Sequence, residues 1–169
     1  KGTSYIETDE KDGNGVYAKT KGIGEVICDK HLTIRTSVVG PELESDGEEL
    51  FHWFMTQSGS ISGHTRAIWS GVTTLELAKA VLWSIENKIT GLYHITNNDS
   101  ICKYDLLKLF KKYTRKEIDI LPIDGKEVDK SFIDTRKLID YKIPSYEKMV
   151  VEMTNLIRCN KVLYSQYTV

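Results

Sequence analysis

The sequence predicts an α/β or α+β fold in which short strands alternate with amphipathic helices. A β-branched run over 32–39 ends at a Gly-Pro pair, which is typical of a strand and its exit. Apolar residues recur with helical spacing between 73 and 85, and a second strand pattern follows at 92–95. Alternation of these two patterns along one chain indicates this fold class.

Composition is typical of one domain of a soluble, cytoplasmic protein. The chain has 169 residues, of which 40% are hydrophobic and 28% charged, enough to bury a core. The formal net charge is −1 with no basic stripe, so we expect no nucleic-acid partner. No apolar run could span a bilayer, and residues 1–10 lack the apolar region of a signal peptide. Cys28, Cys102 and Cys159 have no paired spacing, which argues against a disulfide framework or a metal site.

The first part of the chain predicts one helix and one strand. Residues 1–15 are rich in turn-forming residues, and a helix is expected over 16–27. Tyr17 and Lys21, spaced four apart, share one face of this helix. The strand over 32–39 follows after a short connection.

The middle of the chain predicts two helices separated by an exposed segment. The first helix is expected over 48–57, with its apolar residues on one side. Residues 57–70 are rich in serine and glycine, and they are expected to form an exposed connection. Thr73 and Glu76 then form a capping-box pattern at the start of the second helix.

The last part of the chain predicts two strands and two helices. The strands are expected at 92–95 and 118–121. Ser100 and Ser145 are expected to cap the two helices, because serine side chains accept hydrogen bonds from free N–H groups. These helices are expected to end near residues 113 and 157.

Tyr17 and Lys21 are the candidate catalytic residues. A free tyrosine has a pKa of about 10, too high for efficient proton transfer at neutral pH. A cation held nearby favours the phenolate and lowers that pKa, which suits acid/base work on a carbonyl or an alcohol. The spacing alone is also common on ordinary surface helices, so the surrounding sequence decides its meaning.

That surrounding sequence resembles the extended short-chain dehydrogenase/reductases. In this family a Tyr-x-x-x-Lys helix is followed by a glutamate, here Glu25, and by a strand with an Arg-Thr-Ser turn. Four segments in the family order carry the resemblance: 16–25, 32–41, 71–78 and 91–97, followed by a helix-like 100–110. The sequence is most similar to the dTDP-4-dehydrorhamnose reductases and related sugar-nucleotide reductases, whereas epimerases and dehydratases share the same scaffold.

The resemblance implies a role for each matching residue. Tyr17 would donate the proton to the sugar C4 carbonyl, and Lys21 would bind the nicotinamide ribose and lower the tyrosine pKa. Thr36, Ser37 and Val38 would lie near the nicotinamide and the substrate, at the carboxyl end of a strand where ligands gather in open α/β sheets.

Two further residues are candidates for substrate binding. Arg66 could bind the nucleotide diphosphate, because a guanidinium group matches paired phosphate oxygens. Its alternative is a solvated surface arginine. Trp69 could stack on the base or close the core, and packing is the favoured role. None of the four histidines has metal-ligand spacing, and a basic cluster over 103–116 fits a solvated helix face.

The sequence departs from the family where the cofactor phosphates should bind. The glycine-rich fingerprint between a first strand and helix is absent, so tight NAD(P)H binding by this chain alone is not expected. We therefore expect the carboxyl-terminal part of a Rossmann-like enzyme, with residues 1–40 ending the cofactor domain and 41–169 forming a small mixed α+β substrate-binding portion. The strand at 32–39 would then have an open edge and an uncovered apolar face, for a missing front half or a homodimer to cover.

The expected function of the intact protein is NAD(P)H-dependent reduction of a nucleotide-linked 4-keto-6-deoxy sugar, a step in polysaccharide precursor synthesis. An epimerase or dehydratase acting on a similar nucleotide sugar is one alternative. A non-catalytic module that binds a nucleotide diphosphate sugar without the cofactor is another. The sequence does not distinguish NADH from NADPH, and it identifies neither the sugar nor the base.

Overall fold

The computed structural model describes residues 2–125, 127–136 and 140–169. Within them lie helices α1 Val16–Ile23, α2 Leu50–Thr56, α3 Thr74–Glu86, α4 Lys103–Thr114 and α5 Tyr146–Cys159. The strands are β1 Leu32–Arg35, β2 Val38–Val39, β3 Ser60–His64, β4 Ala67–Trp69, β5 Val72–Thr73, β6 Gly91–His94, β7 Ile101–Cys102, β8 Asp119–Ile123 and β9 Val128–Asp129.

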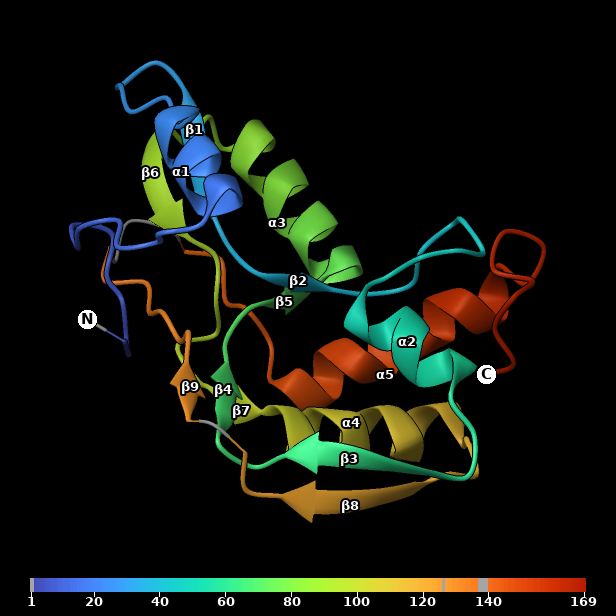
Figure 1. Cartoon of the computed structure of the whole chain (residues 1–169). Helices are drawn as coiled ribbons and strands as arrows, with labels where there is room; N and C mark the ends of the chain where they lie inside the picture. Colours follow the sequence, from blue (N-terminus) through green and yellow to red (C-terminus); the bar gives the residue numbers. More distant parts are fainter. Residues whose placement is uncertain (1, 126, 137–139) are drawn as a thin grey trace.

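The strands form four small sheets that are mostly parallel. β1 pairs with β6, β2 with β5, and β3 with β8, each in parallel. β4 lies between antiparallel β7 and parallel β9. Figure 1 shows β1, β6, α1 and α3 gathered in one part of the molecule, and β3, β8, α2, α4 and α5 in another. The short pairs β2–β5 and β4–β7 lie between the two parts (Figure 1).

The larger core fills the space between α2, α4 and α5. Phe51, Phe54 and Phe110 are fully buried there, and the rings of Phe51 and Phe110 meet edge to face with centroids 5.1 Å apart. A second cluster around Val72 and Met149 joins β5 to α3 and α5. Burial of large apolar side chains is the main stabilising contribution to such a fold. The first cluster therefore stabilises the part around α4, and the second joins that part to α3.

Two elements near the start of the chain are shorter than the sequence predicts. The helix expected over 16–27 ends at Ile23, and Gly24 follows as its C-cap. The strand expected over 32–39 is broken into β1 and β2, which pair in different sheets. The break falls at Thr36 and Ser37. Pairing with β6 ends at Arg35, and pairing with β5 begins at Val38.

The expectation of an exposed connection over 57–70 is wrong. This segment contains β3 and β4. In β3 only Ile61 and Gly63 are buried, and Gly63 lies against Tyr104. Because glycine has no apolar side chain, the alternation of apolar and polar residues that predicts a strand is almost absent from this sequence. β3 is formed because β8 pairs with it along its whole length.

The helix caps are predicted correctly in two of three cases. Thr73 Oγ1 accepts from the Glu76 backbone N–H, and Ser145 Oγ accepts from that of Lys148. Ser100 is not a cap, because β7 intervenes and Cys102 Sγ accepts from the Asp105 N–H instead.

β1 and the region around α1 present apolar groups to solvent. Among the described strands β6 is the partner of β1, and the other edge of β1 has none. Val16 and Ile23 on α1 are 81% and 85% exposed, and Val26 and Ile27 beyond it are exposed as well. An open strand edge beside exposed aliphatic side chains is a surface that favours association.

Candidate functional site

The break between β1 and β2 places two hydroxyl side chains at the carboxyl end of β1. Thr36 Oγ1 donates to the Ile95 carbonyl, 2.8 Å away, which ties this end of β1 to the chain beyond β6. The Ser37 carbonyl accepts from the Val72 N–H at 2.9 Å, where β2 meets β5. The predicted residues Thr36 and Ser37 therefore sit at a junction between two parallel pairs.

Trp69, predicted to bind substrate or close the core, contacts one of these residues directly. Its indole Nε1–H donates to Ser37 Oγ at 2.6 Å. The ring is partly buried, borders both hydrophobic clusters and lies 5.8 Å from the ring of Tyr146, centroid to centroid. Trp69 therefore packs against the hydrophobic core and also donates a hydrogen bond to the Ser37 hydroxyl.

Tyr17 and Lys21 lie together on α1. Lys21 Nζ is 5.7 Å from the centroid of the Tyr17 ring, and the tyrosine is 76% exposed. The chain contains a second pair with this spacing on α4, where Lys108 Nζ is 5.0 Å from the Tyr104 ring. The geometry of the pair is therefore that of a common helix contact.

Glu25 fixes the segment after α1 to β1. Its two carboxylate oxygens accept from Arg35 Nε and an Arg35 terminal nitrogen at 2.7 and 2.8 Å, and Lys11 Nζ lies 2.5 Å from the same carboxylate. The hydrogen bond from Arg35, followed by that from Lys11, outweighs burial and lowers the pKa of Glu25 to about 2. The carboxylate thus stays charged and ties the segment after α1 to the carboxyl end of β1.

Glu7 forms a second acidic anchor near the end of β6. It is buried, and its carboxylate accepts from Thr135 Oγ1 at 2.6 Å and from the His94 N–H at 3.3 Å. Burial opposes its ionisation, but the hydrogen bonds prevail and lower its pKa to about 2. Burial and the nearby Glu7 charge raise the pKa of Asp134 to about 6. The pair therefore shares one proton in mildly acidic solution.

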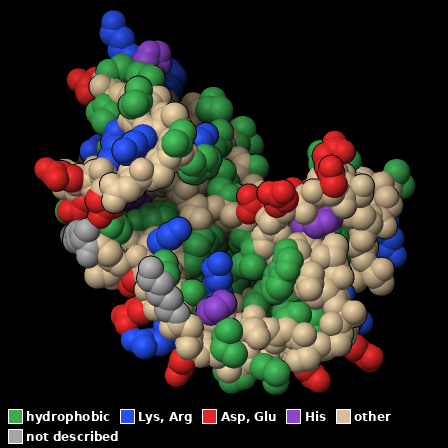
Figure 2. Space-filling view, viewed as in Figure 1, with side chains coloured by type: hydrophobic (Ala, Val, Ile, Leu, Met, Phe, Trp, Pro, Cys, Tyr) green, Lys and Arg blue, Asp and Glu red, His purple; other side chains and the backbone are tan. Residues whose placement is uncertain are grey.

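A cleft of about 620 Å³ opens between α2, β3 and the start of α4. Its walls combine apolar, basic and acidic side chains: Leu50, Trp53, Ile61, Leu107, His64, Lys103, Glu48 and Glu49. Figure 2 shows hydrophobic side chains exposed on the face of the molecule that carries α2 and β3, and a hollow between this part and the part that carries α3. Sequence reasoning missed these residues, because β3 was expected to be an exposed connection.

Arg66 lies on the connection between β3 and β4. Its guanidinium group is exposed and forms an ion pair with Glu127. The residue is close in sequence to His64, which lines the cleft, but Arg66 itself does not line it. A diphosphate bound by Arg66 would have to compete with Glu127.

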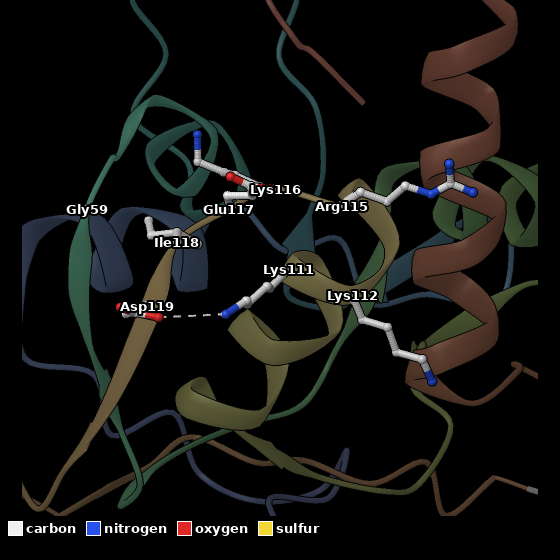
Figure 3. A pocket seen from close by; sticks show the side chains of 8 residues that line it. All are labelled: Gly59, Lys111, Lys112, Arg115, Lys116, Glu117, Ile118 and Asp119. Carbon is white, nitrogen blue, oxygen red and sulfur yellow. Dashed lines mark ion pairs between the residues drawn. The ribbon is translucent and has the colours of Figure 1, made fainter.

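The basic cluster at the end of α4 does not converge on one point. It borders a hollow of about 570 Å³. Figure 3 shows Lys111 directed toward Asp119, Arg115 toward α5, and Lys116 away from both. Lys112 pairs with Glu147 on α5, and Lys116 Nζ donates to the Met55 carbonyl. These cations are held mainly by the protein's own acceptors.

Two negative results apply to the described ranges. No group of three or more histidine, cysteine, aspartate or glutamate side chains could hold a metal ion there. No helix in the same ranges is both long and apolar enough to cross a membrane.

The comparisons with known proteins identify the fold. The sequence matches no profile of a known family, and no curated protein is significantly similar to it. Among solved structures, a dTDP-4-dehydrorhamnose reductase from Yersinia enterocolitica superposes with a TM-score of 0.72 at 21% identity over 90% of this chain. The corresponding reductase from Bacillus anthracis, in complex with NADP, gives 0.76 at 19% identity over 92% of this chain.

More distant structures share the same framework. A dTDP-glucose 4,6-dehydratase from Bacillus anthracis, in complex with NAD, gives a TM-score of 0.56 at 13% identity, covering 79% of this chain and 46% of that one. This chain spans about 60% of the length of the Yersinia enterocolitica reductase and 59% of the Bacillus anthracis one. These likenesses establish a mixed α/β fold with parallel strands, as found in Rossmann-like sugar-nucleotide enzymes.

Proposed function

We propose that this chain is the substrate-side portion of an NAD(P)H-dependent reductase acting on a nucleotide-linked 4-keto-6-deoxy sugar. The observation that carries the proposal is the Tyr17–Lys21 pair on a helix fixed to β1, in a fold shared with sugar-nucleotide reductases. Tyr17 would donate a proton to the sugar carbonyl oxygen, and the Lys21 ammonium would stabilise the phenolate left behind. Such a reaction would supply a precursor for polysaccharide synthesis.

The residues present fit the nicotinamide end of the cofactor. Lys21 and the Ser37 hydroxyl are the groups that would hold this end, because Lys21 lines one hollow with Arg35, the last residue of β1, and Ser37 follows Arg35 by two positions. NAD(P)H supplies the hydride when it is bound. The pyrophosphate end has no glycine-rich helix start in this sequence, so further protein structure has to hold it. The open edge of β1 and the apolar side chains around α1 suit the docking of such structure.

The cleft between α2 and β3 suits the nucleotide. Trp53 offers a face of an aromatic ring to a base, while His64 and Lys103 offer positive charge or hydrogen bonds to phosphate oxygens. Arg66 would join them once Glu127 is displaced. Glu48 and Glu49 also line the cleft and would repel phosphate groups, so we place the phosphates beside Lys103 and the base beside Trp53.

Tyr17→Phe tests the catalytic assignment in the full natural protein. The expected result is a loss of turnover by at least about a hundredfold, because general acid catalysis contributes about that much. The rate of NADPH oxidation with dTDP-4-keto-6-deoxy sugar is measured, together with the dissociation constant of dTDP, which should change little. Normal turnover in this variant would remove Tyr17 from the mechanism.

Tyr104→Phe is the matched control, because Tyr104 and Lys108 have the same spacing and contact on α4. Its turnover should equal that of the wild type. Recycling of the cofactor without net NADPH consumption would favour an epimerase or a dehydratase. Binding of dTDP with no dependence on NADPH and no turnover would favour a binding module.

A further inference from the structure

The hydroxyl groups of Thr36 and Ser37, at the end of β1, have different hydrogen-bond roles. Thr36 Oγ1 donates to the Ile95 carbonyl, so its single hydrogen is engaged within the protein. Ser37 Oγ instead accepts from the Trp69 indole, because an indole N–H can only donate. Within the described part of the chain, Ser37 Oγ has no acceptor for its own hydrogen. A serine held in this way presents an O–H donor to whatever binds beside it.

Trp69 is itself held firmly enough to set the direction of that donor. Its ring borders both hydrophobic clusters and is tilted against the Tyr146 ring. Gly71 lies against the same ring and against the Ser37 carbonyl, and a β-carbon at Gly71 would collide with both. The indole N–H therefore occupies one lone pair of Ser37 Oγ from a fixed side, which restricts where the hydroxyl hydrogen can point.

We propose that Trp69 is a positioning residue, which orients the Ser37 hydroxyl to donate a hydrogen bond to a carbonyl or carboxamide oxygen of a ligand at the carboxyl end of β1. This inference rests on the proposed function for the presence of that ligand. It assigns Trp69 a role different from stacking on a base. The ligand atom facing Ser37 has to be an acceptor, because the remaining polar atom of the serine is a donor.

Binding of NADPH to the full natural protein tests whether the Ser37 hydroxyl donates a hydrogen bond to the ligand. Ser37→Ala should weaken binding roughly five- to tenfold, the value of one ordinary hydrogen bond. Trp69→Phe removes the indole N–H while keeping an aromatic ring, and it should weaken binding in the same direction by a smaller factor. The double variant should bind no worse than Ser37→Ala alone, because Trp69 acts through Ser37. The matched control is Trp83→Phe, because Trp83 lies on α3 and its ring packs against that of Tyr141. This variant should bind NADPH as the wild type does.

A spectrum of the indole N–H groups tests the contact without any ligand. The chain has three tryptophans, so Trp69→Phe identifies the Trp69 signal by its loss. Ser37→Ala should shift that signal and speed its hydrogen exchange, whereas the other two signals should stay in place. An unchanged Trp69 signal would show that the bond does not form, and it would overturn the inference.

The remaining outcomes separate this inference from the proposed function. If the wild type and Ser37→Ala bind NADPH equally well, the Ser37 hydroxyl does not donate to the ligand, while the reductase assignment stands. If the effects of the two single variants simply add, Trp69 does not act through Ser37. If the wild type binds no NADPH, the reductase proposal fails and the donor assignment fails with it, even where the spectrum confirms the Trp69–Ser37 bond.

Discussion

Gly71 lies directly against the Ser37 carbonyl group, where the chain between β4 and β5 passes the break between β1 and β2. A β-carbon at Gly71 would collide with this carbonyl and with the Trp69 ring. Neither can move easily, because the carbonyl accepts from the Val72 N–H and the ring is packed in the core. The absence of a side chain at Gly71 is therefore a requirement of the site.

We expect Gly71→Ala to lower the free energy of unfolding by about 1–3 kcal/mol, the usual cost of overpacking. Urea unfolding followed by circular dichroism measures this change. Gly24→Ala is the matched control, since a β-carbon there would make only an ordinary contact with the Thr20 carbonyl. Equal stability of the two variants would contradict the close approach at Gly71.

Tyr167 near the end of the chain holds the loop before α2. Its hydroxyl lies 2.8 Å from Nδ1 of buried His52 and accepts from the Glu42 N–H at 3.0 Å. Tyr167→Phe would leave both groups without this partner, so we expect a loss of about 1–3 kcal/mol in the free energy of unfolding. Thermal and urea unfolding measure the loss. Tyr164→Phe, which removes a hydroxyl from a neighbouring ring, should cost much less; a similar cost would show that the His52 contact contributes nothing.

Asp134 makes stability depend on pH. Burial is the main reason that its pKa rises from 3.8 to about 6, so the folded state holds this proton more tightly than the unfolded chain does. Its stabilising contribution is present below about pH 3.8 and is lost as the pH rises through about 6. Asp134→Asn removes this dependence. Solvent partly screens the Asp134 carboxyl group. We therefore expect the free energy of unfolding of the wild type, relative to Asp134→Asn, to change by about 1 kcal/mol between about pH 3.8 and about pH 6.

Unfolding in urea at one pH below and one above this window measures the effect. The wild type should lose stability relative to Asp134→Asn as the pH rises. Glu7 acts in the opposite direction at lower pH, since its lowered pKa stabilises the protein above about pH 4.5 and the gain is lost toward pH 2. Asp119→Asn, at an exposed position, should show no such difference from the wild type; a parallel change in both variants would refute the role of Asp134.

The sequence predicted the elements that depend on local signals. Thr73 and Ser145 cap their helices as expected, because a capping side chain and its N–H partner are only three residues apart. The strand expected over 118–121 is present as β8, but the prediction failed for β3, whose pairing with β8 joins residues 59 positions apart, such as Ser60 and Asp119. A single inward aliphatic side chain, Ile61, does not reveal such a strand. Long-range pairing of this kind leaves little trace in the local pattern.

The candidate site was predicted in the same uneven way. The contact of Tyr17 and Lys21 follows from their spacing on one helix, but the resemblance of the surrounding segments singled out this pair. The bond between Trp69 and Ser37 was not foreseen, because the two residues are 32 positions apart and meet only where β2 pairs with β5. Trp53 was missed since the cleft that it lines depends on β3. The roles of all these residues in binding and catalysis stay predictions.

Trp53 provides the sharpest test of the cleft. It is 37% exposed on α2 and lines the cleft together with Leu50 and Ile61. If a base stacks on its ring, Trp53→Ala should raise the dissociation constant of dTDP by roughly tenfold or more, since such stacking contributes about 1–3 kcal/mol. Trp53→Phe keeps an aromatic face and should retain most of the affinity. Isothermal titration with dTDP measures all three proteins, with unfolding curves to confirm that each is folded. Equal affinity of Trp53→Ala and the wild type would place the nucleotide elsewhere.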